Sequence, residues 1–278
     1  MLWSTVATGF KLGLRELQPV QLLFTGAACS WVLFALFAGI RRQYRLATGE
    51  WRVVAVLGLL NPLLYYVLLF EAYARLPAQI AQPLNYTWAV VLAILAVPLL
   101  GQRLTRRTAT GIAVSYVGAV WLVSGNPIVA GTELDRIGIA CALVSTVIWA
   151  SYWLLTARTR SHPLAVMFWS FTVAVPPLSI LCAFGPGWPV LSQHTALFGA
   201  WAGLVEMGVT FLLWQRAMRL TAHAARINQL IFISPFLSFI FIEQTLNKKI
   251  TTHSITTLTI IVVGLVITSV PQSVKATD

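Results

Sequence analysis

The chain has 278 residues, of which 58% are hydrophobic and only 10% are charged, with a net charge of +11. A soluble domain carries about 25% charged residues, so this composition excludes one and indicates an integral membrane protein. The positive charges lie singly or in groups of two or three at the ends of apolar runs. This distribution excludes nucleic-acid binding, which needs basic residues clustered on one soluble face.

Apolar runs long enough to cross a bilayer, about 17–25 residues each, follow one another along the chain. They predict an all-α membrane protein with ten transmembrane helices, over 1–14, 19–40, 52–73, 79–99, 108–124, 136–157, 164–184, 196–215, 223–242 and 252–270. The first run lacks a basic leader and a small-residue cleavage site, so we expect no cleavable signal peptide. Because it is shorter than its counterpart at 136–157, we expect residues that precede Met1 to be missing.

The placement of the basic residues predicts an orientation. If the N-terminus is cytoplasmic, thirteen basic residues fall in inside loops and six in outside loops. The inside set is Arg41, Arg42, Arg45, Arg52, Arg103, Arg106, Arg107, Arg158, Arg160, Arg216, Arg219, Arg226 and Lys275; the outside set is Lys11, Arg15, Arg75, Arg136, Lys248 and Lys249. Lys and Arg accumulate on the cytoplasmic side, so we expect both termini in the cytoplasm of a bacterial inner membrane.

The sequence also repeats itself. The segment 100–105 returns as 246–251, an offset of 146 residues, and Gly118 meets Gly264 at the same offset. We therefore expect two repeats, over 1–125 and 126–278. Because each would hold an odd number of helices, the second must be inverted relative to the first, with a central cavity between them.

These features resemble the drug/metabolite transporter superfamily, specifically its EamA-type repeat, which is carried by Leu100-Gly101-Gln102-Arg103-Leu104. Three short motifs are similar to the aromatic amino-acid exporters of the YddG type: Leu2-Trp3-Ser4-Thr5, Asn85-Tyr86-Thr87-Trp88 and Ile148-Trp149-Ala150-Ser151-Tyr152. The resemblance implies export of amino acids, aromatic ones included, through the central cavity. The family usually has Glu where this chain has Gln102, so a coupling carboxylate must be sought elsewhere.

Polar residues line one face of the predicted helix 79–99. Gln79, Gln82, Pro83 and Tyr86 are spaced i, i+3, i+4 and i+7, which places them on one face of the helix. Asn85 borders that face, and Trp88 lies one turn along. Unpaired polar groups are costly in lipid, so this face should line a substrate cavity or bind a neighbouring helix. Asn228 matches Gln82 in the second repeat, and Pro83 and Pro62 are candidate hinges.

Aromatic residues deep in other spans are further candidates for substrate binding, because rings stack on aromatic side chains and attract ammonium groups. They are Tyr65, Tyr66, Trp149, Tyr152, Trp153 and Trp214. Packing between helices is the alternative. Tryptophans near span ends are assigned to the interfacial belt, and these are Trp3, Trp51, Trp188 and Trp201.

Glu206 is the only carboxylate near the middle of any predicted span. A charge at that depth costs on the order of 2.5–3.5 kcal/mol, so such residues are functional candidates. Glu206 could bind a substrate ammonium or carry a proton. Alternatively, it forms a structural pair with Arg226 or stays protonated and hydrogen-bonded.

The sequence favours a transporter over an enzyme. All four histidines lie at span ends, and neither a metal-binding HExxH motif nor a nucleotide-binding P-loop occurs. A passive channel is disfavoured because no segment resembles an ion filter. We therefore expect a monomer in the lipid bilayer that needs no metal or cofactor and exports amino acids, with drugs or other metabolites as the alternative substrates.

Overall fold

The computed structural model describes residues 2–100, 105–124, 135–190, 192–214 and 233–269. Every regular element in these ranges is a helix, as predicted. In chain order they are a 3₁₀ turn (Leu2–Thr5), α1 (Val6–Glu16), α2 (Pro19–Arg41), α3 (Trp51–Gly58), a kinked helical segment (Leu59–Leu64), α4 (Tyr65–Arg75), α5 (Ala78–Tyr86), α6 (Trp88–Leu100), α7 (Arg106–Ser124), α8 (Arg136–Thr156), α9 (Pro163–Phe184), α10 (Gln193–Ala200), a π-helical segment (Trp201–Val209), α13 (Ser234–Leu246) and α14 (Thr252–Ser269).

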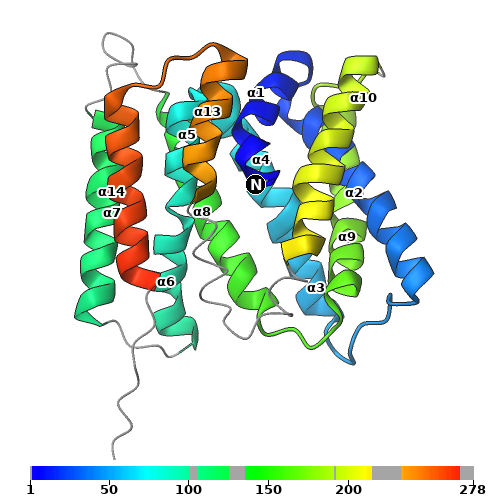
Figure 1. Cartoon of the computed structure of the whole chain (residues 1–278). Coiled ribbons are helices and arrows are strands. Elements are labelled where there is room, and N and C mark those ends of the chain that lie inside the picture. Colours follow the sequence, from blue (N-terminus) through cyan, green and yellow to red (C-terminus); the bar gives the residue numbers. More distant parts are fainter. Residues whose placement is uncertain (1, 101–104, 125–134, 191, 215–232, 270–278) are drawn as a thin grey trace, which may run out of the picture.

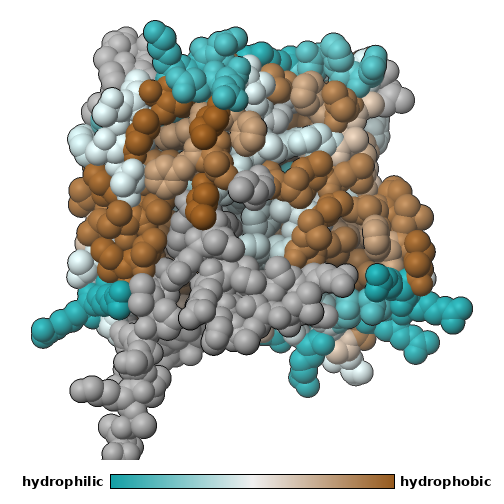
Figure 2. Space-filling model, in the orientation of Figure 1, coloured by the Kyte–Doolittle hydropathy of each residue, from teal (hydrophilic) through white to brown (hydrophobic). Residues whose placement is uncertain are grey.

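The surface is that of a membrane protein. Among the described residues, six helices are long and apolar enough to cross a bilayer. Large apolar side chains such as Phe184 and Ile40 are 89% and 78% exposed. Figure 2 shows an apolar zone at mid-height, with hydrophilic residues gathered at the upper and lower edges. A soluble protein would bury this apolar surface, whereas a bilayer covers it.

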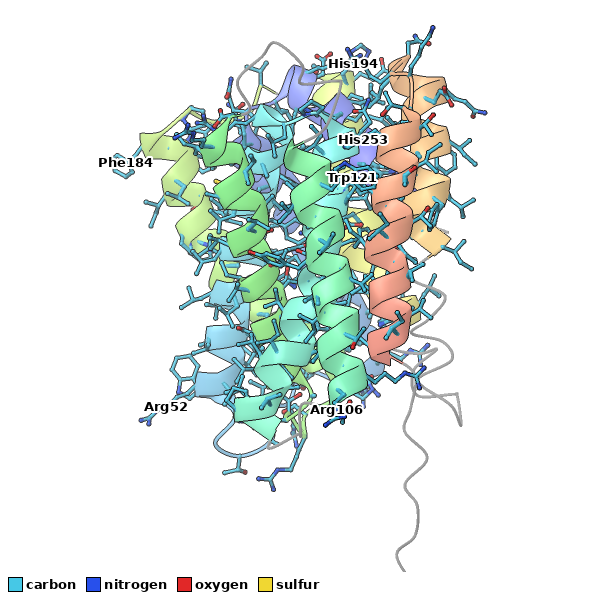
Figure 3. The ribbon with its side chains drawn as sticks, turned by 90° about the vertical axis from the view of Figure 1, so that its left-hand side faces the viewer. Arg52, Arg106, Trp121, Phe184, His194 and His253 are labelled. Atoms are coloured by element: carbon cyan, nitrogen blue, oxygen red, sulfur yellow. The ribbon has the colours of Figure 1, made fainter. Side chains whose placement is uncertain are left out.

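Loops predicted to lie on the same side of the membrane meet in the structure. Arg52 and Arg106 lie at one end of the bundle and His194 lies at the other (Figure 3). At the first end Arg158 donates to the carbonyl of Leu99. At the opposite end Arg75 forms an ion pair with Asp135, with an N–O distance of 3.0 Å. These contacts agree with helices that alternate in direction along the chain.

The helices α7 and α14 pack along their length and run antiparallel (Figure 1). Gly111, near the start of α7, lies against Thr268 near the end of α14, whereas the carbonyl of Trp121, near the end of α7, lies 3.2 Å from the ring of His253. Small residues allow this close approach: a methyl group on Gly264 would lie only 2.3 Å from Ser115 Oγ.

The helices α2 and α9 form a second antiparallel pair. The Cys182 sulfur lies 3.6 Å from the carbonyl of Val20, at the start of α2, and Phe34 and Phe171 meet at the other half with ring centroids 5.1 Å apart. Between these contacts, Trp31 donates its ring N–H to the Thr172 hydroxyl at 2.9 Å.

Three spans are interrupted near their middles. The span Trp51–Arg75 contains Pro62, and the backbone of the preceding Asn61 is extended. The span Gln193–Trp214 is π-helical over Trp201–Val209. In the third, α5 continues through Pro83, a predicted hinge, and the helix breaks four residues later at Thr87, whose N–H bonds the carbonyl of Leu84.

At the end that carries Arg52, Glu50 ties the loop before α3 to the loop between α8 and α9. Its carboxylate accepts hydrogen bonds from the Arg160 N–H at 2.7 Å and from the Ser161 N–H and hydroxyl at 3.0 and 2.5 Å. The Ser161 hydroxyl and these backbone donors lower the pKa of Glu50, because they favour its charged form.

We expect Glu50→Ala to lower the melting temperature at pH 7 by about 2–4 °C, since hydrogen bonds to a half-exposed carboxylate stabilise a fold by about 1 kcal/mol. The folded-state pKa is depressed, so this stabilisation is present above the unfolded pKa and is lost as pH falls through the folded value. Thermal unfolding between pH 7 and 3 should show the two proteins converge at acid pH. Glu243→Ala, at an exposed position on α13, is the control and should show no gap at any pH.

Candidate functional site

Three predicted aromatic residues form one continuous stack at the centre of the bundle. Trp149 of α8 stacks on Tyr65 at the start of α4, with ring centroids 4.4 Å apart and planes inclined by 24°. Its other neighbour in the stack is Tyr152, at 5.7 Å and 22°. Trp88, at the start of α6, meets the Trp149 ring edge-on at 6.5 Å. The structure thus brings together aromatic candidates from three spans.

Two further rings close the other side of Trp149. Phe211 lies 5.7 Å from Trp149, and it is parallel to Trp153 at 6.4 Å. Sequence reasoning missed Phe211, although the repeat contained a usable signal. Phe211 stands 146 residues after Tyr65, so both repeats supply a ring to Trp149 from the same position.

Glu206, in the π-helical segment Trp201–Val209, lies beside this stack. It is only 6% exposed, and its Oε1 accepts a hydrogen bond from the Tyr66 hydroxyl at 3.1 Å. Its Oε2 has no hydrogen-bond partner among the described residues. The ring of Tyr66 lies 4.8 Å from that of Tyr65, which connects the carboxylate to the stack. Arg226, the suggested structural partner, lies outside the described residues.

Asn85 joins the stack to α8 through hydrogen bonds. Its Oδ1 accepts from the Tyr65 hydroxyl at 3.4 Å, and its amide nitrogen donates to the Ser145 hydroxyl at 3.3 Å. Ser145 is fully buried and lies one turn before Trp149, which carries the stack. Asn85 therefore links Tyr65, one of the central rings, to the helix that carries Trp149. Sequence reasoning did not identify Ser145, because a single buried serine in a membrane helix is no signal by itself.

The rest of the predicted polar face of helix 79–99 is divided between different neighbours. Gln79 and Gln82 are both 3% exposed, and the Oε1 of Gln82 has no partner in the part of the chain that the structure describes. The hydroxyl of Tyr86 lies beside Ser234 of α13, which in turn contacts Ser4 at 3.2 Å. Asn228, the second-repeat counterpart of Gln82, lies outside the described residues.

Three tryptophans lie differently from expectation. Trp214 does not join the central stack directly; its ring lies 5.3 Å from that of Trp3, which touches Phe211 at 5.8 Å. Trp3 and Trp201 were assigned to the interfacial belt, and this was wrong. Trp201 packs on Phe10 at 5.9 Å and covers Gly9 of α1. Position near a span end does not distinguish a ring facing lipid from one facing another helix.

The chemistry of this site is that of binding. It offers one buried carboxylate, amide and hydroxyl groups, and the faces of several rings. Such a set can hold an ammonium group by charge and cation–π attraction and can stack on an apolar or aromatic side chain. In the described residues, no three His, Cys, Asp or Glu side chains are grouped as metal ligands would be.

Comparisons with known proteins identify the fold and the family of the chain. An uncharacterized transporter from Archaeoglobus fulgidus is 23% identical over 256 residues, covering 90% of this chain and 87% of that protein. A solved crystal structure shares the fold, with a TM-score of 0.69 and 21% identity over 96% of this chain and 92% of that one. The EamA-like transporter family matches residues 1–124 and again residues 136–270. Since these two matches span most of the sequence, the chain belongs to the EamA-like transporter family, and the prediction of a membrane transporter is confirmed.

Proposed function

We propose that this protein is a secondary transporter that exports neutral amino acids, aromatic ones included, across the bacterial inner membrane by alternating access. The observation that carries the proposal is Glu206, a buried carboxylate with one unpartnered oxygen beside the Tyr65–Trp149–Tyr152 stack. The carboxylate suits the ammonium group that every amino acid has. The rings suit an apolar or aromatic side chain, which agrees with the resemblance to exporters of the YddG type.

An inverted repeat supports alternating access. Ser115 of α7 donates to the carbonyl of Ile261 of α14 at 3.0 Å, and these residues are equivalent at the 146-residue offset. Two equivalent helices that cross antiparallel at equivalent residues are what a two-fold axis in the membrane plane produces. We propose ten helices in a monomer, with both termini cytoplasmic. Single cysteines at Thr48 and Val190, in a chain lacking its three native cysteines, should react with impermeant reagents from the cytoplasmic and outer side respectively.

The contacts between helices support the same symmetry. In the first repeat, α3 and α6 pack against α8, the first helix of the second repeat. Correspondingly, α10 and α13 of the second repeat pack against α1, the first helix of the chain. Exchanging the two repeats therefore exchanges these contacts. The ring stack and Glu206 draw side chains from both repeats, which supports substrate binding between them, as alternating access requires.

Transport by the purified protein in liposomes tests the function. We expect counterflow of labelled phenylalanine, competed by tryptophan, leucine and threonine but not by glutamate. A pH gradient applied across the same liposomes separates proton-coupled transport from uniport. Empty liposomes are the control. Counterflow of other metabolites or drugs with none of any amino acid would reject the amino-acid assignment and leave the alternative substrates of the family.

A further inference from the structure

The kink at Asn61 and Pro62 and the π-helical segment Trp201–Val209 occupy equivalent places in the two repeats. Adding the 146-residue offset to Leu59–Leu64 gives 205–210, which overlaps the second segment, Trp201–Val209. Each segment carries one buried side chain with an oxygen acceptor. In the second repeat it is Glu206, and in the first it is Asn61, which is 2% exposed. The Oδ1 of Asn61 has no hydrogen-bond partner within the described residues.

Another unpartnered polar atom lies next to Asn61. The hydroxyl of Tyr152 lies beside both the Asn61 amide and the Thr156 side chain. The Thr156 hydroxyl is buried and, among the residues described, has no hydrogen-bond partner. Buried polar groups are almost always hydrogen-bonded, and leaving one unpaired is unfavourable. A group of such atoms in one place indicates that a ligand supplies the missing partners.

The ring stack connects this group to Glu206. Tyr65 adjoins Tyr66, which donates to the carboxylate, and the other end of the stack is Tyr152 beside Asn61. Asn61 precedes Tyr66 by five residues in the span Trp51–Arg75, which starts at the end of the bundle that carries Arg52. Asn61 is therefore displaced toward that end, which is the proposed cytoplasmic end (Figure 3).

We propose that Asn61, Tyr152 and Thr156 form a second ammonium-binding subsite on the cytoplasmic side of Glu206, which takes the primary ammonium group of an amino acid or amine entering from the cytoplasm. The proposal rests on the proposed function. Neutral oxygens bind an ammonium group less tightly than a carboxylate does. The entering substrate therefore pauses here and passes along the faces of Tyr152 and Trp149 to Glu206.

Asn61→Leu and Thr156→Val remove the subsite oxygens with little change of shape. We expect each to raise the KM for phenylalanine applied from the cytoplasmic side by about tenfold, the effect of one lost hydrogen bond to a charged group. The melting temperature should not fall, because an unpaired buried atom has been removed. Thr146→Val is the matched control, since it deletes a buried hydroxyl of the same helix that bonds its own backbone at Leu143. It should leave the KM unchanged.

Two inhibitors identify the group that is recognised. Phenethylamine carries the ammonium without a carboxylate, and 3-phenylpropionate carries the carboxylate without an ammonium. Inhibition by phenethylamine should weaken in Asn61→Leu, and inhibition by 3-phenylpropionate should not change. An unchanged phenylalanine KM in both variants, or an equal loss for both inhibitors, overturns the subsite.

The proposed function and the subsite can fail separately. If the wild-type protein transports no amino acid, the function fails, and calorimetric binding of phenethylamine to detergent-purified wild type and Asn61→Leu still decides the subsite. Weaker binding by the variant supports the subsite, and equal binding or none to the wild type overturns it.

Discussion

Glu206→Gln is expected to lower net transport by about tenfold or more and to flatten its dependence on pH, while exchange of substrate across the membrane partly survives. Glutamine keeps the shape of the side chain and can still accept the hydrogen bond from the Tyr66 hydroxyl, but it cannot carry a negative charge or a transferable proton. A tenfold loss corresponds to about 1.4 kcal/mol, which is modest for removing a charge from a buried ion pair with the substrate. Initial rates in liposomes between pH 5.5 and 8.5 would measure both effects.

Two controls separate charge from packing at this position. Tyr66→Phe removes the donor to Glu206 but keeps the ring and the carboxylate, so its transport should retain a pH dependence. Glu243→Gln changes a carboxylate exposed on α13 and should behave as the wild type. If Glu206→Gln shows wild-type rates and an unchanged pH profile, Glu206 has a structural role and the coupling group lies elsewhere.

Much of the architecture was readable from the sequence, because membrane spans depend on average properties of long segments. Hydrophobic length, basic residues at span ends and the repeat offset each involve many residues, so single deviations matter little. The repeat even identifies close contacts: Gly118 and Gly264 both lie where α7 and α14 pack together. Family membership follows from the same long-range features.

The site was predicted less completely, because periodicity gives the face of a helix and not what the face meets. Asn85 and Tyr86 are adjacent in sequence, yet Asn85 binds Tyr65 and Ser145 whereas Tyr86 lies beside Ser234. The break of the fourth span at Thr87 lies four residues after Pro83, since a proline removes one backbone bond without fixing where the helix bends.

Asn61 is a second residue whose role the sequence alone does not indicate. Beside Pro62 it is most simply a residue at a kink, and nothing in the sequence places its side chain near Tyr152. Only the three-dimensional arrangement shows that its oxygen is buried without a partner in the described part of the bundle. The unpaired polar atoms, rather than the motifs, therefore extend the candidate site beyond the residues that the sequence identifies.

Trp149→Ala is expected to have the largest effect on substrate selection, because this ring contacts Tyr65, Tyr152, Trp88 and Phe211 at the centre of the site. Stacking an aromatic ring contributes about 0.5–1.5 kcal/mol beyond the burial of its apolar area. Because Trp149→Ala loses both the stacking and the buried area against the substrate, the kcat/KM for phenylalanine should fall about 100-fold. The value for threonine, which has no ring to stack, should fall much less.

Removing a buried tryptophan also leaves a cavity, which costs about 3–5 kcal/mol of stability, so the selectivity ratio is the decisive measurement. Trp149→Phe keeps a stacking face and should restore most of the preference for phenylalanine over threonine. Trp88→Ala and Asn85→Ala, which remove the edge-on ring and the amide that bonds Tyr65, should weaken transport in the same direction. Trp51→Ala, at an exposed position at the start of α3, is the control. A loss that is equal for both substrates and parallels a lower melting temperature would mean that Trp149 serves the packing of the bundle and not the recognition of the substrate.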